Sequence, residues 1–299
     1  RATEIIMKDG RVAGVKATTK DGKVYTIDAK AVVLATGGFG ANQDMLVKYQ
    51  PKLKGYATTN QPGATGDGII LAEHAGAALV DMKQIQAHPT AAPDGTLISE
   101  SVRGDGGILI NAEGKRFTNE LLTRDVVSAA ELKQPGRFAW VFWDDATRKS
   151  AKLMDSYISM GLAVKGNTVA EIAKAMNVPA AELEATLKAY AAGKAAGKDA
   201  FGRADMPRDL DKGPFYAILV TPAVHHTMGG IKIDPLTQVY NTKGQVIPGL
   251  FAAGEVTGGV HGGNRLGGNA QADIVTFGRI AGEQAYIFAK QLDAAQAKK

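Results

Sequence analysis

The stretch LFAAGEVTGGVHGGNRLGGNA, residues Leu250–Ala270, indicates the fold of this chain. An apolar run ends at Ala253, seven glycines fall within Gly254–Gly268, and a helical pattern begins near Asn269. Glycine suits tight turns and close backbone packing because it has no Cβ. A buried strand that leads through such a turn into a helix is typical of α/β proteins with a ligand at the strand end. The sequence therefore predicts an α/β fold with a ligand near this turn.

The composition narrows the class of protein. Of the 299 residues, 45% are hydrophobic and 22% charged, which is typical of a folded chain with a real core. The 36 glycines make up about 12%, against a usual value of about 7%, yet no short repeat accompanies them. The absence of cysteine excludes disulfides, cysteine-ligated metals and thiol catalysis within this stretch.

The net charge of +5 does not indicate a nucleic-acid partner. Lysines and arginines are scattered, and no basic run contains interleaved aromatic residues. No run approaches the roughly 18 apolar residues that a membrane helix needs. We therefore expect neither a nucleic acid nor a membrane span, while attraction of a small anion would need particular arginines.

The start of the chain has the same glycine-rich pattern. Asp-Gly pairs at 9–10 and 21–22 separate β-rich runs, which predicts a meander of hairpin-linked strands. The apolar run Ala31–Ala35 then ends in a Thr-Gly-Gly turn, as expected of a buried parallel strand. A helix is expected from residue 65 to about residue 79.

The middle of the chain has a different pattern. Short strands are expected at 107–111 and 138–143, and Thr168 with Glu171 forms a capping box at the start of a helix. Residues 191–200, rich in glycine and lysine, are expected to form a loop. This region predicts an α+β domain that is inserted into the α/β domain.

The pattern of the first region returns after Pro222, so the layout is that of one domain split by another. We expect the α/β domain to comprise residues 1–82 and 223–299, and the inserted domain to comprise residues 83–222. Interfaces between such domains are favoured places for ligand sites.

Histidines mark both boundaries of the insertion. His88 lies in QAHPT at one boundary, and His225 with His226 lies in HHTMGG at the other. Folding would bring them to one cleft, although hinge polar groups that simply satisfy hydrogen bonds are the alternative. Neither an HxH nor an HExxH pair occurs, so a zinc enzyme is not expected and no metal-binding side chains are assigned.

Several charged residues stand out. Arg265 lies among glycines, where the bare backbone leaves room for a bidentate contact with a carboxylate. Glu255 directly follows a predicted strand and suits ribose or ribityl hydroxyls. Glu100 and Arg103, taken alone, favour an ordinary salt bridge.

Eight motifs occur in order: VVLATGGF, GATGDG, QAHPT, SESVRG, LLTRD, HHTMGG, LFAAGEVTGGVHGGNRLGGNA and FGRIAG. Together they resemble the flavoprotein subunits of fumarate reductases and succinate dehydrogenases, and they are most similar to the soluble flavocytochrome c fumarate reductases. The resemblance runs across nearly the whole chain. It implies a partial FAD-binding, glutathione-reductase-like α/β domain that is split by an inserted α+β capping domain.

The chain departs from this family at its start. The family begins with a strand–GxGxxG–helix unit that binds the FAD pyrophosphate, and no GxGxxG follows a strand here. The resemblance therefore implies a C-terminal part, with the unit that carries this motif preceding Arg1. An electron-donor haem domain or cytochrome would lie upstream or in trans, and the implied setting is periplasmic electron transport in anaerobic respiration.

The resemblance assigns roles to single residues. Arg124 would give the proton to the substrate, and Glu100 with Arg103 would reprotonate it from solvent. The residues implied for the small dicarboxylate are His88, Ser99, Glu100, His225, Arg265 and Gly268. Those implied for FAD, bound without a covalent link, are Ala35, Thr36, Asp67, His226, Glu255, Ala270 and Gln271.

The implied reaction is the reduction of fumarate to succinate, with a hydride from FAD N5 and a proton from Arg124. An arginine acid is unexpected, because its ordinary pKa exceeds about 12. A desolvated site shared with Arg103 and Arg265 favours loss of one charge. Two alternatives stay open: a related flavin ene-reductase for methacrylate or urocanate, and an inactive fragment of such an enzyme without cofactor.

Overall fold

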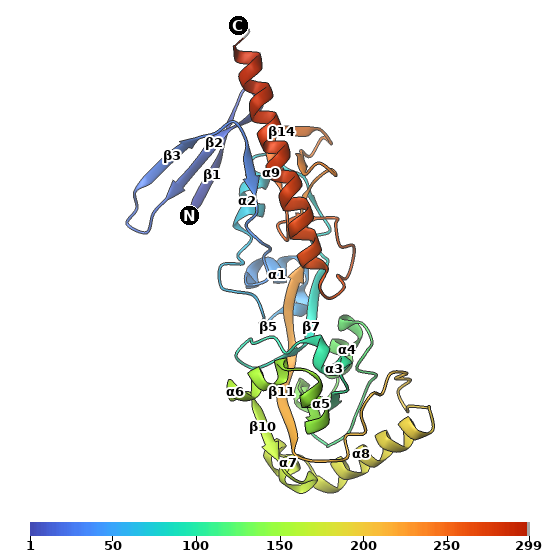
Figure 1. Cartoon of the computed structure of the whole chain (residues 1–299). Helices are drawn as coiled ribbons and strands as arrows, with labels where there is room; N and C mark the ends of the chain where they lie inside the picture. The colour runs from blue at the N-terminus through green and yellow to red at the C-terminus, as the bar shows by residue number, and fades with distance from the viewer. Residues whose placement is uncertain (298–299) are drawn as a thin grey trace. The chain divides into compact units, whose positions relative to one another are not determined.

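A computed structural model describes residues 1–297, which form two compact units. Unit 1 comprises Arg1–Gly55, Asn60–Gln86 and the residues from His225 onward, and unit 2 comprises Tyr56–Thr59 and Ala87–Val224. Figure 1 colours their elements by position along the chain. Unit 1 is thus assembled from three segments, whereas one segment supplies nearly all of unit 2.

An antiparallel meander opens unit 1. Its strands β1 (Ala2–Lys8), β2 (Arg11–Thr18) and β3 (Val24–Asp28) pair in sequence order. The first turn holds Asp9 and Gly10 at φ angles of 50° and 76°, values that aspartate and glycine tolerate better than most residues. The meander expected from the two Asp-Gly pairs is therefore present.

The second sheet of unit 1 contains the strand that precedes the glycine-rich stretch. Its order is β13 (Gln238–Tyr240), β14 (Val246–Ala252) and β4 (Val32–Leu34). β14 runs parallel to β4, with Leu250 opposite Val32. Because the carboxyl ends of parallel strands meet at one sheet edge, the turns that follow β4 and β14 begin side by side.

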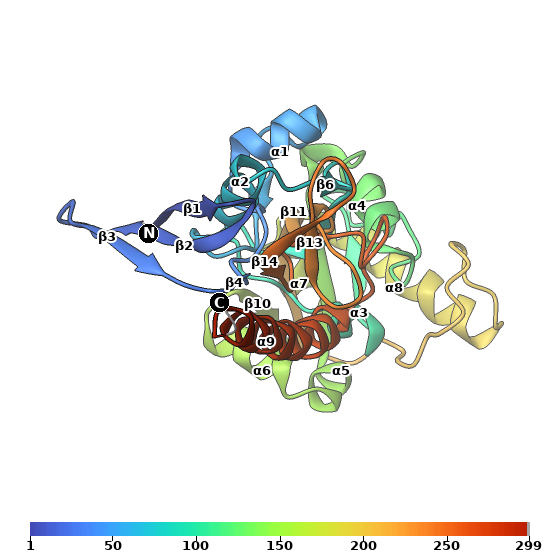
Figure 2. The same cartoon turned by 90° about the horizontal axis from the view of Figure 1, so that it is seen from above.

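Helix α9 (Asn269–Gln296) follows the glycine-rich stretch and packs on β14 and β4, whereas β2 of the meander also contacts β14 (Figures 1 and 2). Phe251 and Ala253 from the sheet side and Ala281 from α9 form a buried apolar cluster, and Phe288 adds its ring edge-on to Phe251. This packing confirms the expected strand–turn–helix arrangement. Among residues 1–297, no helix combines the length and apolar character needed to cross a membrane.

A third small sheet and two helices complete the description of unit 1. The elements are β6 (Leu79–Val80), β12 (Gly230–Lys232), β15 (Thr257–Gly258), α1 (Gln43–Tyr49), α2 (Asp67–His74) and a 3-10 turn, η1 (Pro51–Leu53).

The helix expected over residues 65–79 is too long. α2 ends at His74, Gly76 takes a φ of 88°, and Leu79 pairs with Ile231 in the small sheet. A residue at positive φ cannot continue a right-handed helix, so the glycine sets the end of α2.

Unit 2 is built on a sheet of order β10-β11-β9-β8, and β5 and β7 also pair with β11. The strands are β5 (Ala57–Thr58), β7 (Ile85–Ala91), β8 (Ile108–Ile110), β9 (Ala139–Asp144), β10 (Ala163–Gly166) and β11 (Phe215–Thr227). Successive strand residues point to opposite faces. Phe142 therefore joins a core with α7 and α8, while Val141 and Trp143 join a second core with α3, α4 and α6.

The helices of unit 2 are α3 (Glu100–Gly104), α4 (Arg124–Glu131), α5 (Asp145–Ser150), α6 (Leu153–Ser159), α7 (Val169–Met176) and α8 (Ala180–Ala195), with a 3-10 turn, η2 (Pro135–Arg137). As expected, Thr168 caps α7, its hydroxyl accepting the Glu171 amide at 3.2 Å. The loop expected at 191–200 is wrong in its first half, because α8 continues to Ala195. Alanine and lysine are strong helix formers and outweigh one interior glycine here.

Candidate active site

In unit 2, one carboxylate joins two arginines. Arg124, the first residue of α4, donates from Nη2 to Glu100 Oε2 at 2.9 Å. The other oxygen of Glu100 accepts from Arg103 Nη2 at 3.4 Å. Glu100 and Arg103 are three residues apart on α3 and thus share a helix face. The structure brings together the three residues that the sequence assigns to proton delivery.

The three side chains of this group differ in exposure. Arg103 and Arg124 are buried, whereas the Glu100 side chain is 42% exposed. Burial lowers the pKa of Arg103, the charge of Glu100 opposes this, and the charge of Arg124 adds to it. Glu100 is thus the member of the group that water reaches most readily.

A further carboxyl in this region, Glu131, is missed by sequence reasoning. It is fully buried at the end of α4, seven residues after Arg124 and so on the same helix face. Burial raises the pKa of Glu131 well above its ordinary value, although the charge of Arg103 and the Ala139 amide oppose the rise. A glutamate on a short polar helix is normally exposed, so the sequence carries no signal for this burial.

We expect Glu131→Gln to stabilise the protein more at pH 8 than at pH 5. Above about 4.5, the ordinary pKa of this side chain, the unfolded chain releases a proton that the folded chain keeps. Native stability is therefore lost as pH rises towards the raised folded pKa, and glutamine removes that loss. Each 1 kcal/mol recovered would raise Tm by about 2–4 °C in thermal unfolding.

The exposed Glu113 offers a control for this experiment. Glu113→Gln makes the same chemical change at an exposed position, and the effect of Glu131→Gln on Tm is measured relative to it at each pH. A Glu131→Gln effect that is equally large at pH 5 and pH 8 would contradict the assignment of a protonated, buried carboxyl.

His88 and Ser99 also lie in unit 2. His88 is buried on β7, and its Nδ1 accepts the Thr90 amide N–H at 3.2 Å. An amide can only donate, so the proton of a neutral His88 sits on Nε2, which becomes a hydrogen-bond donor. Ser99 caps α3, accepting the Ser101 amide at 3.2 Å.

In unit 1, Arg265 is held by Gln86. Arg265 Nη2 donates to Gln86 Oε1 at 3.2 Å, and Gln86 Nε2 donates back to the Arg265 carbonyl at 2.6 Å. Both side chains are buried. Gln86 therefore fixes the main chain and the guanidinium of Arg265 together. Gln86 belongs to the QAHPT motif, and nothing in the sequence signals this contact.

Glu255 lies at the sheet edge where the turns after β4 and β14 begin. Its Oε1 accepts the Thr227 amide at 2.9 Å and the Thr227 hydroxyl at 3.2 Å. A Cβ at Gly38 would come within 2.1 Å of that hydroxyl, so only glycine fits there. Burial raises the pKa of Glu255, while the Thr227 hydrogen bonds and the charge of Arg265 oppose the rise.

The other residues predicted for a cofactor are spread over unit 1. Thr36 follows β4, and its hydroxyl would lie 2.1 Å from a Cβ at Gly68. Asp67 pairs instead with Arg1, at 2.6 Å between Nη2 and Oδ1. Ala270 and Gln271 form the first turn of α9 after its cap, Gly268.

The two histidines of the HHTMGG motif have different partners in unit 1. The His225 carbonyl accepts from the Asn60 amide at 3.4 Å. The His226 ring lies edge-on to His261 with 5.3 Å between centroids, and His261 Nε2 is 3.1 Å from Asp273 Oδ2. Sequence reasoning gives no role to His261 or Asp273.

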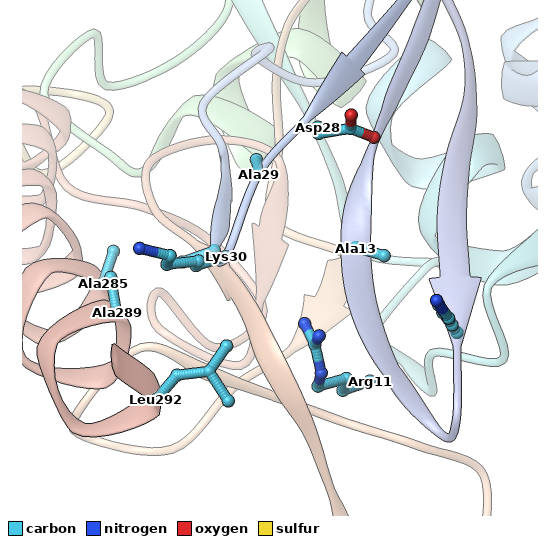
Figure 3. Close-up of a pocket in the computed structure, with 10 residues that line it drawn as sticks. Arg11, Ala13, Asp28, Ala29, Lys30, Ala285, Ala289 and Leu292 are labelled. Atoms are coloured by element: carbon cyan, nitrogen blue, oxygen red, sulfur yellow. The ribbon is translucent and has the colours of Figure 1, made fainter. Parts of the chain in front are cut away.

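An open hollow of about 800 Å³ in unit 1 contains none of the predicted site residues (Figure 3). Lys8, Arg11 and Lys30 line it, with the apolar side chains of the last turns of α9. Lys30 forms an ion pair with Asp293 of that helix. The predicted site residues of unit 1 thus lie outside this hollow.

Comparison of the whole sequence with known protein families identifies the family of this chain. Residues 1–270 match the family described as FAD binding domain. Because this match covers most of the chain, the chain belongs to the FAD binding domain family, and FAD is the cofactor of that family.

Individual relatives narrow the class. The chain is 50% identical to the fumarate reductase (cytochrome) of Shewanella frigidimarina, over 97% of this chain and 52% of the relative. It is 37% identical to the urocanate reductase of Eggerthella lenta, over 97% of this chain and 50% of the relative. A solved open conformation of a flavocytochrome c3 fumarate reductase matches with a TM-score of 0.82 and 47% identity, over 97% of this chain and 52% of that one. The chain thus spans about half the length of these relatives, and the expected family and fold class are confirmed.

Proposed function

We propose that this chain forms part of a flavin-dependent fumarate reductase, which reduces fumarate to succinate. The observation that carries the proposal is the Arg124–Glu100–Arg103 group, found in a chain similar to a fumarate reductase. A guanidinium that is hydrogen-bonded to a half-exposed carboxylate can donate a proton and then be reprotonated from solvent through that carboxylate.

FAD is the cofactor, bound without a covalent link to this chain. The turns that contain Ala35 and Glu255 begin at one sheet edge, the usual place for a ligand of an open α/β sheet. Gly37 has no side chain, and a Cβ built at this position would meet no atom within 4 Å, so there is open space beside the backbone of this turn. Glu255 supplies a partly buried carboxyl for a ribityl or ribose hydroxyl. When bound and reduced, FAD supplies the hydride. The remaining residues proposed to hold it are Thr36, Asp67, His226, Ala270 and Gln271.

Arg124 supplies the proton. It protonates the alkene carbon next to the one that accepts the hydride, and fumarate thereby becomes succinate. Solvent then protonates the Glu100 carboxylate, which passes this proton to the neutral Arg124 across their 2.9 Å hydrogen bond and so returns both groups to their starting state. Arg103 is buried beside this pair, and its burial together with the charge of Arg124 lowers the pKa of Arg103, although the charge of Glu100 opposes this shift.

The substrate is a small dicarboxylate. Arg265, preset by Gln86, binds one carboxylate with His225 and Gly268, since a buried guanidinium grips a carboxylate through two hydrogen bonds. His88, through the proton on Nε2, binds the other with Ser99 and Glu100. Holding both ends orients the double bond, and such orientation lowers the barrier by several kcal/mol.

We expect kcat/KM to be about 100-fold or more higher for fumarate than for methacrylate or urocanate. A substrate with one carboxylate leaves part of the cationic set unpaired, which costs a few kcal/mol. Steady-state kinetics of the flavin-loaded protein with the three substrates measures the ratio. A higher kcat/KM for methacrylate or urocanate would identify a related ene-reductase instead, and turnover of none would identify an inactive part.

The electron donor is a haem domain or cytochrome, upstream or in trans. The relative from Shewanella frigidimarina is itself named a fumarate reductase (cytochrome), which supports this partner. The corresponding setting is periplasmic electron transport in anaerobic respiration.

A further inference from the structure

Unit 2 contains a buried cluster of charges that the proposed mechanism does not use. The cluster comprises Arg116, Glu120, Asp199 and Arg203, whose side chains are at most 4% exposed. Glu120 accepts from Arg116 Nε and Nη2, both at 2.8 Å, and from Arg203 Nη1 at 3.1 Å. Arg116 Nη1 also donates to Asp199 at 2.6 Å. Burying four charges is costly unless they are paired, and here each charge has a partner of opposite sign. We therefore asked what this paired cluster holds in place.

Arg203 links this cluster to the proton-delivery group, which consists of Arg124, Glu100 and Arg103, through hydrogen bonds to the main chain. Its Nη2 donates to the Arg103 carbonyl at 2.7 Å, and its Nη1 donates to the Gly107 carbonyl at 2.9 Å. α3 has only five residues, so its carbonyls depend on partners outside the helix. Arg203 caps this end with a positive charge, which suits the negative end of a helix.

A second contact closes a ring. The Arg103 guanidinium donates from Nη1 to the Glu120 carbonyl, while the Glu120 carboxylate accepts from Arg203. Arg103 is therefore held at its carbonyl by Arg203 and at its guanidinium by Glu120 and Glu100. Glu120 also lies only four residues before Arg124, so the ring fixes the chain segment that leads into α4.

We propose that Arg203 is a positioning residue for proton delivery, which fixes α3 so that Glu100 stays within hydrogen-bond distance of both Arg103 and Arg124. This inference rests on the proposed fumarate reductase activity. Arg203 belongs to the segment between α8 and β11, whose chain returns to α3 after leaving α8 (Figure 1). That segment is thus joined to the end of α3 through Arg203.

The test compares Arg203→Gln with Arg116→Gln in the flavin-loaded protein that contains this chain. Arg116 is also a buried partner of Glu120, but its side chain donates to Glu120 and Asp199 rather than to the Arg103 carbonyl. We expect Arg203→Gln to lower kcat for fumarate by about 10-fold or more, with KM changed by about 2-fold at most, because misplaced proton donors slow the chemical step. The solvent deuterium isotope effect on kcat should rise as well.

Arg116→Gln should lower Tm but leave the solvent isotope effect at the wild-type value. An Arg203→Gln variant with a wild-type kcat and isotope effect, or with the same kinetics as Arg116→Gln, would overturn the proposal. If Arg203→Gln fails to retain flavin, Arg203→Lys, which keeps the positive charge, takes its place. A raised isotope effect in that variant supports the positioning role, and a wild-type value overturns it.

Arg124→Ala separates this inference from the activity on which it rests. If Arg124→Ala still turns over fumarate, the proposed function fails, whatever Arg203 does. If Arg124→Ala is inactive while the Arg203 variants behave as the wild type, only the positioning role fails.

Discussion

Replacing Arg124 with alanine is expected to lower the rate of fumarate reduction by about 1,000-fold or more, with the flavin still bound. Arg124 is the proposed proton donor, and positioned general acids contribute about 10²–10⁴-fold. Its side chain is buried in unit 2 and bonded to Glu100, whereas the residues proposed to hold FAD belong to unit 1. Alanine therefore removes the donor and alters none of the residues proposed to hold FAD.

Two half-reactions measure this effect. Reduction of the bound flavin by dithionite should proceed normally in Arg124→Ala, whereas reoxidation of the reduced flavin by fumarate should be almost abolished. Arg148→Ala is the matched control, since Arg148 pairs with Asp145 and Asp155 of α5 and α6 rather than with Glu100. Wild-type reoxidation by fumarate in Arg124→Ala would refute the proton-donor role.

Arg265→Ala is expected to lower kcat/KM for fumarate by about 100-fold or more. Removing one partner of a buried, hydrogen-bonded charge pair costs about 2–5 kcal/mol, and the fumarate carboxylate would lose its guanidinium partner. Gln86 would also lose the guanidinium to which it is bonded. The effect should appear in steady-state kinetics as a higher KM together with a lower kcat.

Gln86→Leu provides the graded comparison for Arg265. It removes the amide that bonds the Arg265 guanidinium and carbonyl but leaves the charge, so a loss of about 10-fold is expected. An Arg265→Ala variant with unchanged kcat/KM for fumarate would show that this carboxylate is bound elsewhere. If Gln86→Leu lowers kcat/KM for fumarate as much as Arg265→Ala does, the placement of the chain around Arg265, rather than the guanidinium itself, would account for the binding energy.

Local patterns in the sequence predict much of the fold. The Asp-Gly turns specify the meander, because few residues tolerate their backbone angles. The apolar run before the glycine-rich stretch specifies a buried strand, and both parts behave as expected. The errors occur where the pattern is ambiguous. α2 was expected to run past Gly76, and the alanine-rich end of α8 resembles a loop because of its glycines.

The site is predictable only where a motif carries it. The group of Arg124, Glu100 and Arg103 follows from family motifs, since no local rule joins residues from two helices. Gln86 forms hydrogen bonds with Arg265, which lies 179 positions further along the chain, and no sequence periodicity predicts this contact. The Arg116–Glu120 pair has helix-like i, i+4 spacing, but its burial depends on Arg203, which lies far along the chain.

The discontinuity of unit 1 has a consequence for the order of folding during synthesis. The Phe39 amide donates to the Thr227 hydroxyl, 188 positions further along the chain. During synthesis, residues Ala87–Val224 of unit 2 therefore leave the ribosome before this contact can form. Closing so long a chain costs entropy, and a unit 2 that is already compact shortens the flexible loop to be closed. Unit 2 is therefore expected to fold first, and the edge of unit 1 that carries Glu255 to form last. Substitutions that weaken the core of unit 2 would thus reduce the yield of flavin-loaded protein even though they lie far from that edge in sequence.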